Sequence, residues 1–248
     1  MGSGQTLLDR FSRLYVINLP QRTDRRRQFA RQLRRLGLSY GDAGVILYPA
    51  IRPEDPAGFS TLGTRGCFMS HLGVLTAAAA DQADSVIVCE DDLDFAQDFA
   101  ERLPKLLAEV ASQPWDILYL GHYSLEDVPP DPAGAALIRL AANVPVGGTH
   151  FMVVRRSVHA DLIAYLQAIL TRPPGHPDGG PMHVDQAFSW FRARHPQVVT
   201  LAALPPLGYQ RRSRTDIHVL PFYDRLPVLR TLSTLARRLI PKGRRYRV

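Results

Sequence analysis

A run of apolar residues that ends in three consecutive acids constrains this chain most. Residues 86–89 read Val-Ile-Val-Cys, and Glu90, Asp91 and Asp92 follow at once. Such a run is typical of a buried strand in an α/β sheet, whose ligands bind beyond the carboxyl ends of the strands. Adjacent carboxylates repel one another unless a cation or a proton neutralises them, so the pattern predicts a metal–diphosphate site. The alternative interpretation is a solvated turn in which one acid caps the next helix.

Strand-like and helix-like segments alternate along the rest of the chain. Strands are expected over residues 14–19, 45–50, 86–90, 115–121, 151–154 and 198–203. Helices are expected over residues 23–36, 66–80, 99–111, 157–170 and 183–194, the first of them capped by Thr23 or Asp24. This alternation predicts an α/β fold with a mostly parallel central sheet flanked by helices.

Composition narrows the class of protein and of partner. The 248 residues are 46% hydrophobic and 21% charged, which suits one large globular domain rather than a disordered chain. The formal net charge of +7 favours anionic partners such as nucleotides, phospholipid headgroups or nucleic acid. Cys67 and Cys89 lie in apolar runs without a Cys-x-x-Cys spacing, so we expect buried core thiols and a reducing compartment. No signal peptide or membrane-spanning run is expected.

The two ends of the chain differ from its centre. Residues 1–13 are expected to be a flexible N-terminus, and residues 14–218 are expected to form the main domain. Residues 219–248 are predicted to be a basic amphipathic tail, because residues 225–248 hold eight basic side chains, no acids and a periodic apolar face. That tail suits an anionic membrane surface, and its alternative is a helix docked on the protein.

Five short motifs follow one another in a fixed order. They are YVINL (15–19) with RTDRR (22–26), GCFMSH (66–71), EDD (90–92), GT (148–149) before a strand, and VDQ (184–186). The series resembles glycosyltransferase family 25, over about residues 14–217. The resemblance implies a GT-A-like nucleotide-sugar-binding fold, a UDP-sugar donor, Mn²⁺ or Mg²⁺, and transfer with inversion at the anomeric carbon. One departure is that Thr64 and Arg65 stand where the family often has an acid before Gly-Cys.

The resemblance also suggests which residues bind the metal. Glu90 and Asp92 stand in the places of the acidic metal motif, and on a continuing strand they would point to the same face while Asp91 points aside. Asp92 is therefore the predicted direct ligand, with Glu90 sharing its face. A late histidine, His218, is the candidate that would complete the metal shell from the tail.

Donor-binding residues are predicted around the same strand ends. Asn18 and Leu19 end the first strand, and Arg22 and Arg25 lie at a helix start where charge and dipole favour phosphate. The other contacts expected of the donor involve Ser70 and His71, which we expect to open a helix, together with Glu90 and Asp91. The alternative for the arginines is solvated surface charge, and for His71 a satisfied core histidine.

Transfer with inversion needs a base that takes the proton of the acceptor hydroxyl. Asp185, at the head of a predicted helix, is the candidate, and a plain helix cap is the alternative. Glu126 and Asp127 are lesser candidates for the same role.

The functional expectation is a metal-dependent inverting glycosyltransferase. It would move a sugar, with galactose favoured, from a UDP-sugar to a hydroxyl of a lipopolysaccharide, a lipooligosaccharide or another surface glycan. A cytoplasmic location, peripheral on the inner face of the cytoplasmic membrane, fits a lipid-linked acceptor. The alternatives are a basic nucleic-acid-binding α/β protein and a catalytically inactive glycosyltransferase-like scaffold. Nucleic acid is disfavoured as a partner because the basic residues are scattered without interleaved aromatics.

Overall fold

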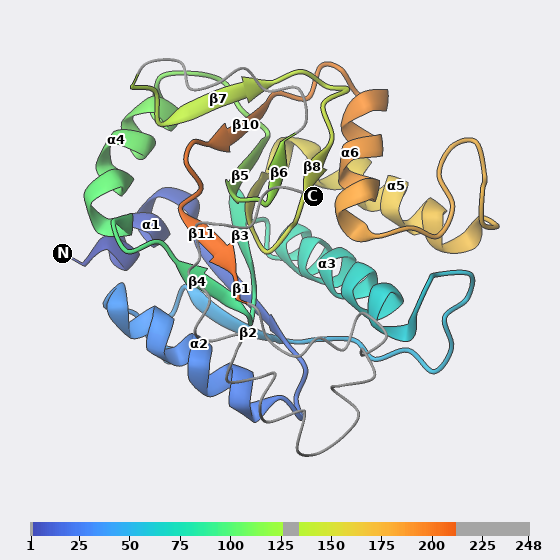
Figure 1. Cartoon of the computed structure of the whole chain (residues 1–248), viewed down its shortest axis with the longest axis horizontal. Coiled ribbons are helices and arrows are strands. Elements are labelled where there is room, and N and C mark those ends of the chain that lie inside the picture. The colour runs from blue at the N-terminus through green and yellow to red at the C-terminus, as the bar shows by residue number, and fades with distance from the viewer. Residues whose placement is uncertain (1, 126–133, 212–248) are drawn as a thin grey trace.

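A seven-stranded sheet with helices on both faces forms the centre of the molecule (Figure 1). The computed structural model describes residues 2–125 and 134–211. The sheet order is β2 (Val45–Pro49), β1 (Arg13–Asn18), β3 (Ser85–Glu90), β9 (Phe151–Arg155), β5 (Ile117–Gly121), β10 (Thr200–Ala203) and β7 (Leu137–Leu140). The helices are α1 (Ser3–Phe11), α2 (Thr23–Arg35), α3 (Leu62–Ala80), α4 (Phe99–Ala111), α5 (His159–Thr171), which follows the 3-10 turn η1 (Arg156–Val158), and α6 (Val184–Arg194). The described residues also form two small two-stranded sheets. One pairs β4 (Leu93–Phe95) with β11 (Gly208–Gln210), and the other pairs β6 (Ser124–Leu125) with β8 (Val146–Gly147).

Strand directions make the sheet mostly parallel. β2, β1 and β3 pair in parallel, as do β5 and β10. β9 lies between β3 and β5 and is antiparallel to both, and β7 is antiparallel to β10. The predicted α/β class, with a mostly parallel central sheet flanked by helices, is confirmed. Within the described ranges, no helix has the length and apolar character needed to cross a membrane.

Strand alternation divides the core into two layers. In β3, Val86 and Val88 point into a core shared with α3, α5 and α6, while Ile87 and Cys89 point into a core shared with α1, α2 and α4. All four side chains are at most 1% exposed, so β3 is covered on both faces. That double burial explains why its sequence is continuously apolar rather than alternating. Cys89 is a buried thiol, as predicted.

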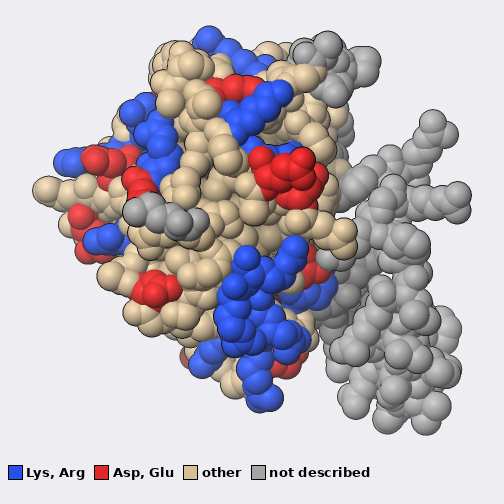
Figure 2. All heavy atoms as spheres, turned by 90° about the vertical axis from the view of Figure 1, so that its left-hand side faces the viewer, with Lys and Arg blue, Asp and Glu red and all other residues tan. Residues whose placement is uncertain are grey.

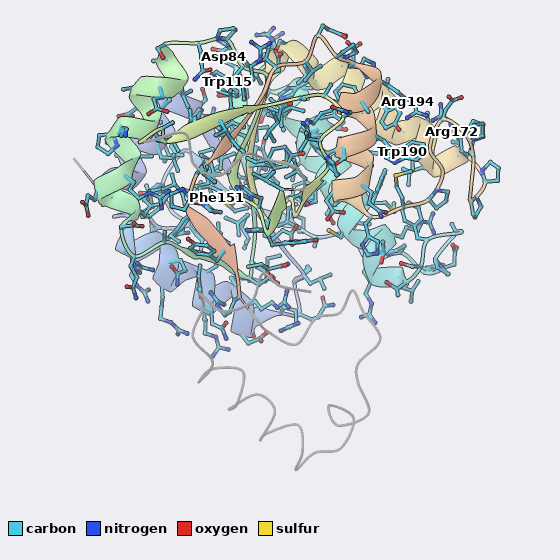
Figure 3. All side chains as sticks on the ribbon, turned by 45° about the horizontal axis from the view of Figure 1, so that its top comes forward. Asp84, Trp115, Phe151, Arg172, Trp190 and Arg194 are labelled. Atoms are coloured by element: carbon cyan, nitrogen blue, oxygen red, sulfur yellow. The ribbon has the colours of Figure 1, made fainter. Side chains whose placement is uncertain are left out.

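The antiparallel strand β9 is anchored by an aromatic cluster. Phe151 is fully buried (Figure 3), and its ring centroid lies 5.4 Å from that of Phe95 and 6.4 Å from that of Phe99. These rings join β9 to β4 and to the start of α4. The cluster therefore fixes the position of residues 148–150, which lead into β9.

The expectation of a flexible N-terminus over residues 1–13 is wrong for the described part of that segment. Residues Ser3–Phe11 form α1, and Leu7 and Phe11 are fully buried in the core on the α2 side of the sheet. The amide of Gly4 donates to Leu36 O over 2.9 Å. Leu7, Leu8 and Phe11 share one helix face, so burial of that face stabilises a helix that the Gly-Ser start conceals.

The arginines of α2 face solvent for the most part. Arg27, Arg31, Arg34 and Arg35 are exposed, and a group of basic side chains is prominent on the face of the molecule that carries α2 (Figure 2). The helix begins at Thr23 with Arg22 as its cap residue, so the expectation that Thr23 or Asp24 caps it is wrong. Asp24 instead accepts two hydrogen bonds from the guanidinium of Arg22 over 3.0 Å.

Candidate functional site

The carboxyl ends of β1 and β3 meet in a cluster of carboxylates around the guanidinium of Arg25. β1 and β3 are parallel neighbours, so Asn18 and the acids after β3 reach the same edge of the sheet. Asn18 Nδ2 donates to Asp91 Oδ2 over 2.6 Å. The Nη1 atom of Arg25 lies 2.9 Å from Asp91 Oδ1 and 3.3 Å from Asp92 Oδ2. The structure thus brings together four of the predicted residues.

Glu90 points to a different set of partners. Its Oε1 atom lies 3.2 Å from His71 Nε2 and accepts a hydrogen bond from the Thr149 hydroxyl over 3.3 Å. The premise that strand alternation aligns Glu90 with Asp92 is wrong, because β3 ends at Glu90 and the next two residues form a turn. Asp92 consequently shares Arg25 with Asp91.

Electrostatics distinguish Asp92 from its neighbours. Burial and the adjacent charge of Glu90 raise the pKa of Asp92 to about 7, against the opposing effect of Arg25. Its Oδ1 atom is buried and has no hydrogen-bond partner among the described residues. Burial also raises the pKa of Asp91, whereas for Glu90 burial is outweighed by the contact with His71, which lowers the pKa. Of the three acids, Asp92 is therefore the carboxylate that a bound cation would stabilise most.

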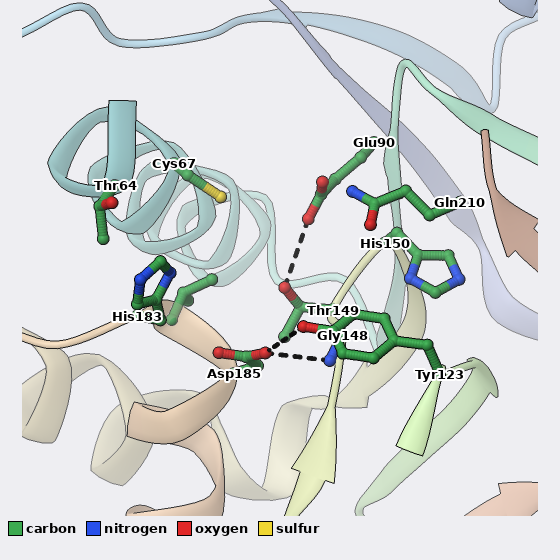
Figure 4. A pocket seen from close by; sticks show the side chains of 11 residues that line it. Thr64, Cys67, Glu90, Tyr123, Gly148, Thr149, His150, His183, Asp185 and Gln210 are labelled. Atoms are coloured by element: carbon green, nitrogen blue, oxygen red, sulfur yellow. Dashed lines mark hydrogen bonds between the residues drawn. The ribbon is translucent and has the colours of Figure 1, made fainter. Parts of the chain in front are cut away.

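A pocket opens beside Glu90 and reaches to the start of α6 (Figure 4). Glu90 lines it from the end of β3, Thr149 from the segment before β9, Cys67 from α3, and Asp185 from α6. Asp185 Oδ2 accepts hydrogen bonds from the Tyr123 hydroxyl over 2.9 Å and from the Gly148 amide over 3.1 Å. Two carboxylates therefore line the pocket, Glu90 from β3 and Asp185 from α6.

Asp185 is held by contacts that a helix cap would not need. The cap residue of α6 is His183, so the alternative interpretation of Asp185 as a plain cap is wrong. Asp185 Oδ1 accepts a hydrogen bond from the amide of Gln186 over 2.8 Å. Burial and the charge of Asp185 raise the pKa of Tyr123, so its hydroxyl stays protonated and donates to the carboxylate. This geometry orients Asp185 in the pocket, and its role as base stays a prediction.

Several predicted residues lie away from this pocket. Ser70 and His71 lie in the middle of α3 rather than at its start, because the helix begins at Leu62 with Thr61 as its cap. The Ser70 hydroxyl donates to Gly66 O over 2.6 Å and accepts from the amide of Ile51 over 2.8 Å, so it is fully buried as a structural contact. Leu19 is half-buried just after β1. His218, Glu126 and Asp127 lie outside the described residues.

The expectation that Cys67 is a buried core thiol is wrong, since it is only half-buried and lines the pocket. Sequence reasoning also missed Tyr123 and Thr149 as pocket residues. Their signals were present, because Tyr123 follows a strand end and Thr149 belongs to the Gly-Thr motif. A link between these two segments and Asp185 required the tertiary structure.

Comparison with known proteins finds a family match over part of the chain. The model described as "Glycosyltransferase family 25 (LPS biosynthesis protein)" matches residues 50–147. This part of the chain is similar to glycosyltransferase family 25. The resemblance seen in the sequence motifs is thereby confirmed, and the match includes Cys67, His71 and the acids after β3.

Curated relatives of this chain include animal proteins. It is 34% identical over 131 residues to a probable inactive glycosyltransferase 25 family member 3 of Bos taurus, covering 45% of this chain and 22% of the relative. It is 30% identical over 141 residues to procollagen galactosyltransferase 1-B of Xenopus laevis, covering 49% of this chain and 23% of the relative. The matches thus span less than a quarter of these relatives' length.

One similar solved structure covers most of this chain. It is a glycosyltransferase involved in the glycosylation of the major capsid of PBCV-1, with 8% identity and a TM-score of 0.48. That comparison covers 82% of this chain and 93% of the other.

Proposed function

We propose that this chain is a metal-dependent, inverting glycosyltransferase that uses a UDP-sugar. The observation that carries the proposal is the placement of Asp185 and Glu90 in one pocket, at the carboxyl end of β3, in a chain that is similar in part to family 25. Ligands of α/β sheets bind at such strand ends, and a displacement reaction needs an oriented base. The pocket supplies both requirements.

The residues after β3 fit a hard divalent cation. Asp92 has a buried oxygen atom without a partner, and its neighbours Glu90 and Asp91 add negative charge that a cation would neutralise. Asp92 would hold the ion, because oxygen ligands suit Mn²⁺ and Mg²⁺. A cation there would act as a Lewis acid that neutralises charge on the leaving diphosphate. Arg25 adds a second positive group beside the same carboxylates.

Asp185 would accept the proton of the acceptor hydroxyl. The hydroxyl of Tyr123 and the amide of Gly148 hold its Oδ2 atom, which fixes the carboxylate in the pocket. A base positioned in this way contributes about 10²–10⁴-fold to a reaction rate. Inversion requires one such base, because the acceptor oxygen displaces the diphosphate directly.

The donor sugar, the acceptor and the location are further parts of the proposal. Galactose is favoured because a 30%-identical relative is named as a procollagen galactosyltransferase. A lipopolysaccharide or other surface glycan is favoured because the family description names LPS biosynthesis. The basic tail, residues 219–248, lies outside the described residues, and its charge suits a peripheral site on the inner face of the cytoplasmic membrane.

Donor binding and donor hydrolysis test the proposal. Calorimetric titration with UDP is expected to show binding that requires Mn²⁺ or Mg²⁺, and thermal shift across nucleotide sugars identifies the donor. Asp185→Asn is expected to lower transfer about 10²–10⁴-fold while UDP affinity is kept. Asp161→Asn is the matched control, since Asp161 is an exposed acid in the first turn of α5. No UDP binding with Mn²⁺ present would reject the proposal.

A catalytically inactive scaffold is the second candidate. It is favoured by the relative that is 34% identical and is named probably inactive. A scaffold would bind UDP without hydrolysing any nucleotide sugar, and Asp185→Asn would then change nothing measurable. Salt-sensitive binding of nucleic acid in the absence of nucleotide-sugar binding would instead support the nucleic-acid alternative.

A further inference from the structure

Cys67, His71 and Glu90 form a cluster that the proposed transfer reaction does not use as a unit. One ligand atom from each side chain, the thiol sulfur, an imidazole nitrogen and a carboxylate oxygen, lies within 4.8 Å of the other two. Cys67 and His71 are four residues apart on α3 and therefore share a helix face. Glu90 approaches that face from the end of β3, with its Oε1 atom 3.2 Å from His71 Nε2.

We propose that Cys67, His71 and Glu90 form a binding site for Zn²⁺ that is separate from the hard-cation site at Asp92. A thiolate and an imidazole are ligands that Zn²⁺ prefers, whereas Mn²⁺ and Mg²⁺ prefer oxygen. Tetrahedral zinc places its ligand atoms roughly 3.5 Å apart. The three atoms are close enough to reach that spacing by small side-chain rotations.

The imidazole of His71 has an unmet hydrogen-bonding need. His71 is 1% exposed, and its Nδ1 atom has no hydrogen-bond partner in the part of the chain that the structure describes. When the ring proton lies on Nε2, shared with Glu90, the lone pair of Nδ1 is buried without a donor. A cation bound at Nδ1 would use that lone pair directly.

Three protein ligands leave the fourth position of a tetrahedral zinc ion open. Cys67 and Glu90 line the pocket, so that position would face the pocket and could hold water or an anionic oxygen. Binding converts the Cys67 thiol to a thiolate, and the released proton goes to solvent. The site requires no oxidant or reductant.

Cobalt spectroscopy tests the site without any donor or acceptor. The full chain, freed of metal by a chelator, is titrated with Co²⁺, and a thiolate-to-cobalt charge-transfer band is expected in the near ultraviolet. Competition with a chromophoric chelator then gives the Zn²⁺ affinity. Cys67→Ala is expected to abolish the band and weaken Zn²⁺ binding roughly tenfold or more.

The controls separate this site from its neighbours. Cys89→Ala removes the other described thiol, which points into the core on the far face of β3, and is expected to keep the band. Asp92→Asn is also expected to keep it, and His71→Gln is expected to weaken Zn²⁺ binding. No band in the wild-type chain, a band that survives Cys67→Ala, or a band lost in Asp92→Asn would overturn the proposal. Failure of UDP binding would not affect this result.

Discussion

The amide of Gly148 donates to Asp185 Oδ2 over 3.1 Å, which ties the segment before β9 to the first turn of α6. Gly148 has a φ of +92°, a value that side-chain-bearing residues rarely adopt. A Cβ atom at this position would lie 2.8 Å from the ring of Tyr123. Glycine is therefore required both for the backbone conformation and for the contact between Tyr123 and Asp185.

Gly148→Ala is expected to impair transfer far more than it impairs folding. Backbone strain should cost about 1–3 kcal/mol, while displacement of Tyr123 and Asp185 by about 1 Å should lower kcat/KM by about 100-fold. Gly175→Ala is the control, since Gly175 has a φ of +77° and nothing within 4 Å of the added Cβ atom. Equal activity of the two variants would contradict the role assigned to Gly148.

Asp92→Asn is expected to stabilise the metal-free protein at pH 8. The pKa of Asp92 is raised from 3.8 to about 7 by burial and Glu90, so the folded chain retains a proton that the unfolded chain releases between these values. Stability therefore falls as pH rises through this window, and at pH 8 the buried charge opposes folding. The gain in the variant should be on the order of 4 kcal/mol at pH 8 and should vanish near pH 3.

Mn²⁺ should make the wild type more stable than Asp92→Asn, which is the reverse of the order expected without metal. Mn²⁺ that binds the folded state raises the unfolding temperature of the wild type, and Asp92→Asn should lose that increase. Thermal unfolding at pH 8, with Mn²⁺ and with chelator, measures both effects. An Asp92→Asn protein that is less stable without metal would show that the carboxylate is already satisfied.

The sequence predicted the sheet more accurately than the site. A continuous apolar run before Glu90 identified β3, since a strand covered on both faces needs no alternation. The prediction that Glu90 and Asp92 point to the same face was wrong, because the chain turns just after Glu90. Asp92 therefore contacts Arg25, as Asp91 does. The conformation of a two-residue turn depends on its tertiary contacts, and the periodicity of a sequence does not reveal those contacts.

The start of α3 shows the same limit in a helix. The sequence predicted a helix that begins at Gly66, yet α3 begins at Leu62 with a Thr61 cap. Gly66 lies inside α3, where a Cβ atom would approach Ile51 O to 2.6 Å. The glycine serves close packing, which only the tertiary structure reveals.

Arg25→Gln is expected to destabilise the fold at pH 8 by about 2–4 kcal/mol. The side chain of Arg25 is 12% exposed and contacts two carboxylates, so its loss leaves Asp91 and Asp92 without that charge partner. Arg31→Gln on the exposed face of α2 should change stability by less than about 0.5 kcal/mol. Urea unfolding measures both, and equal midpoints would mean that Arg25 does not neutralise the cluster.

Leu7→Ala tests whether α1 belongs to the folded unit. Leu7 is fully buried on the α2 side of the sheet, so truncation should cost about 2–5 kcal/mol through lost burial and the cavity left behind. For a chain of this size, that cost lowers the unfolding temperature by roughly 5–15 °C. Gln5→Ala, on the exposed face of the same helix, should lower it by no more than about 2 °C. Calorimetry distinguishes the cases, because a flexible N-terminal segment would make both variants unfold at the wild-type temperature.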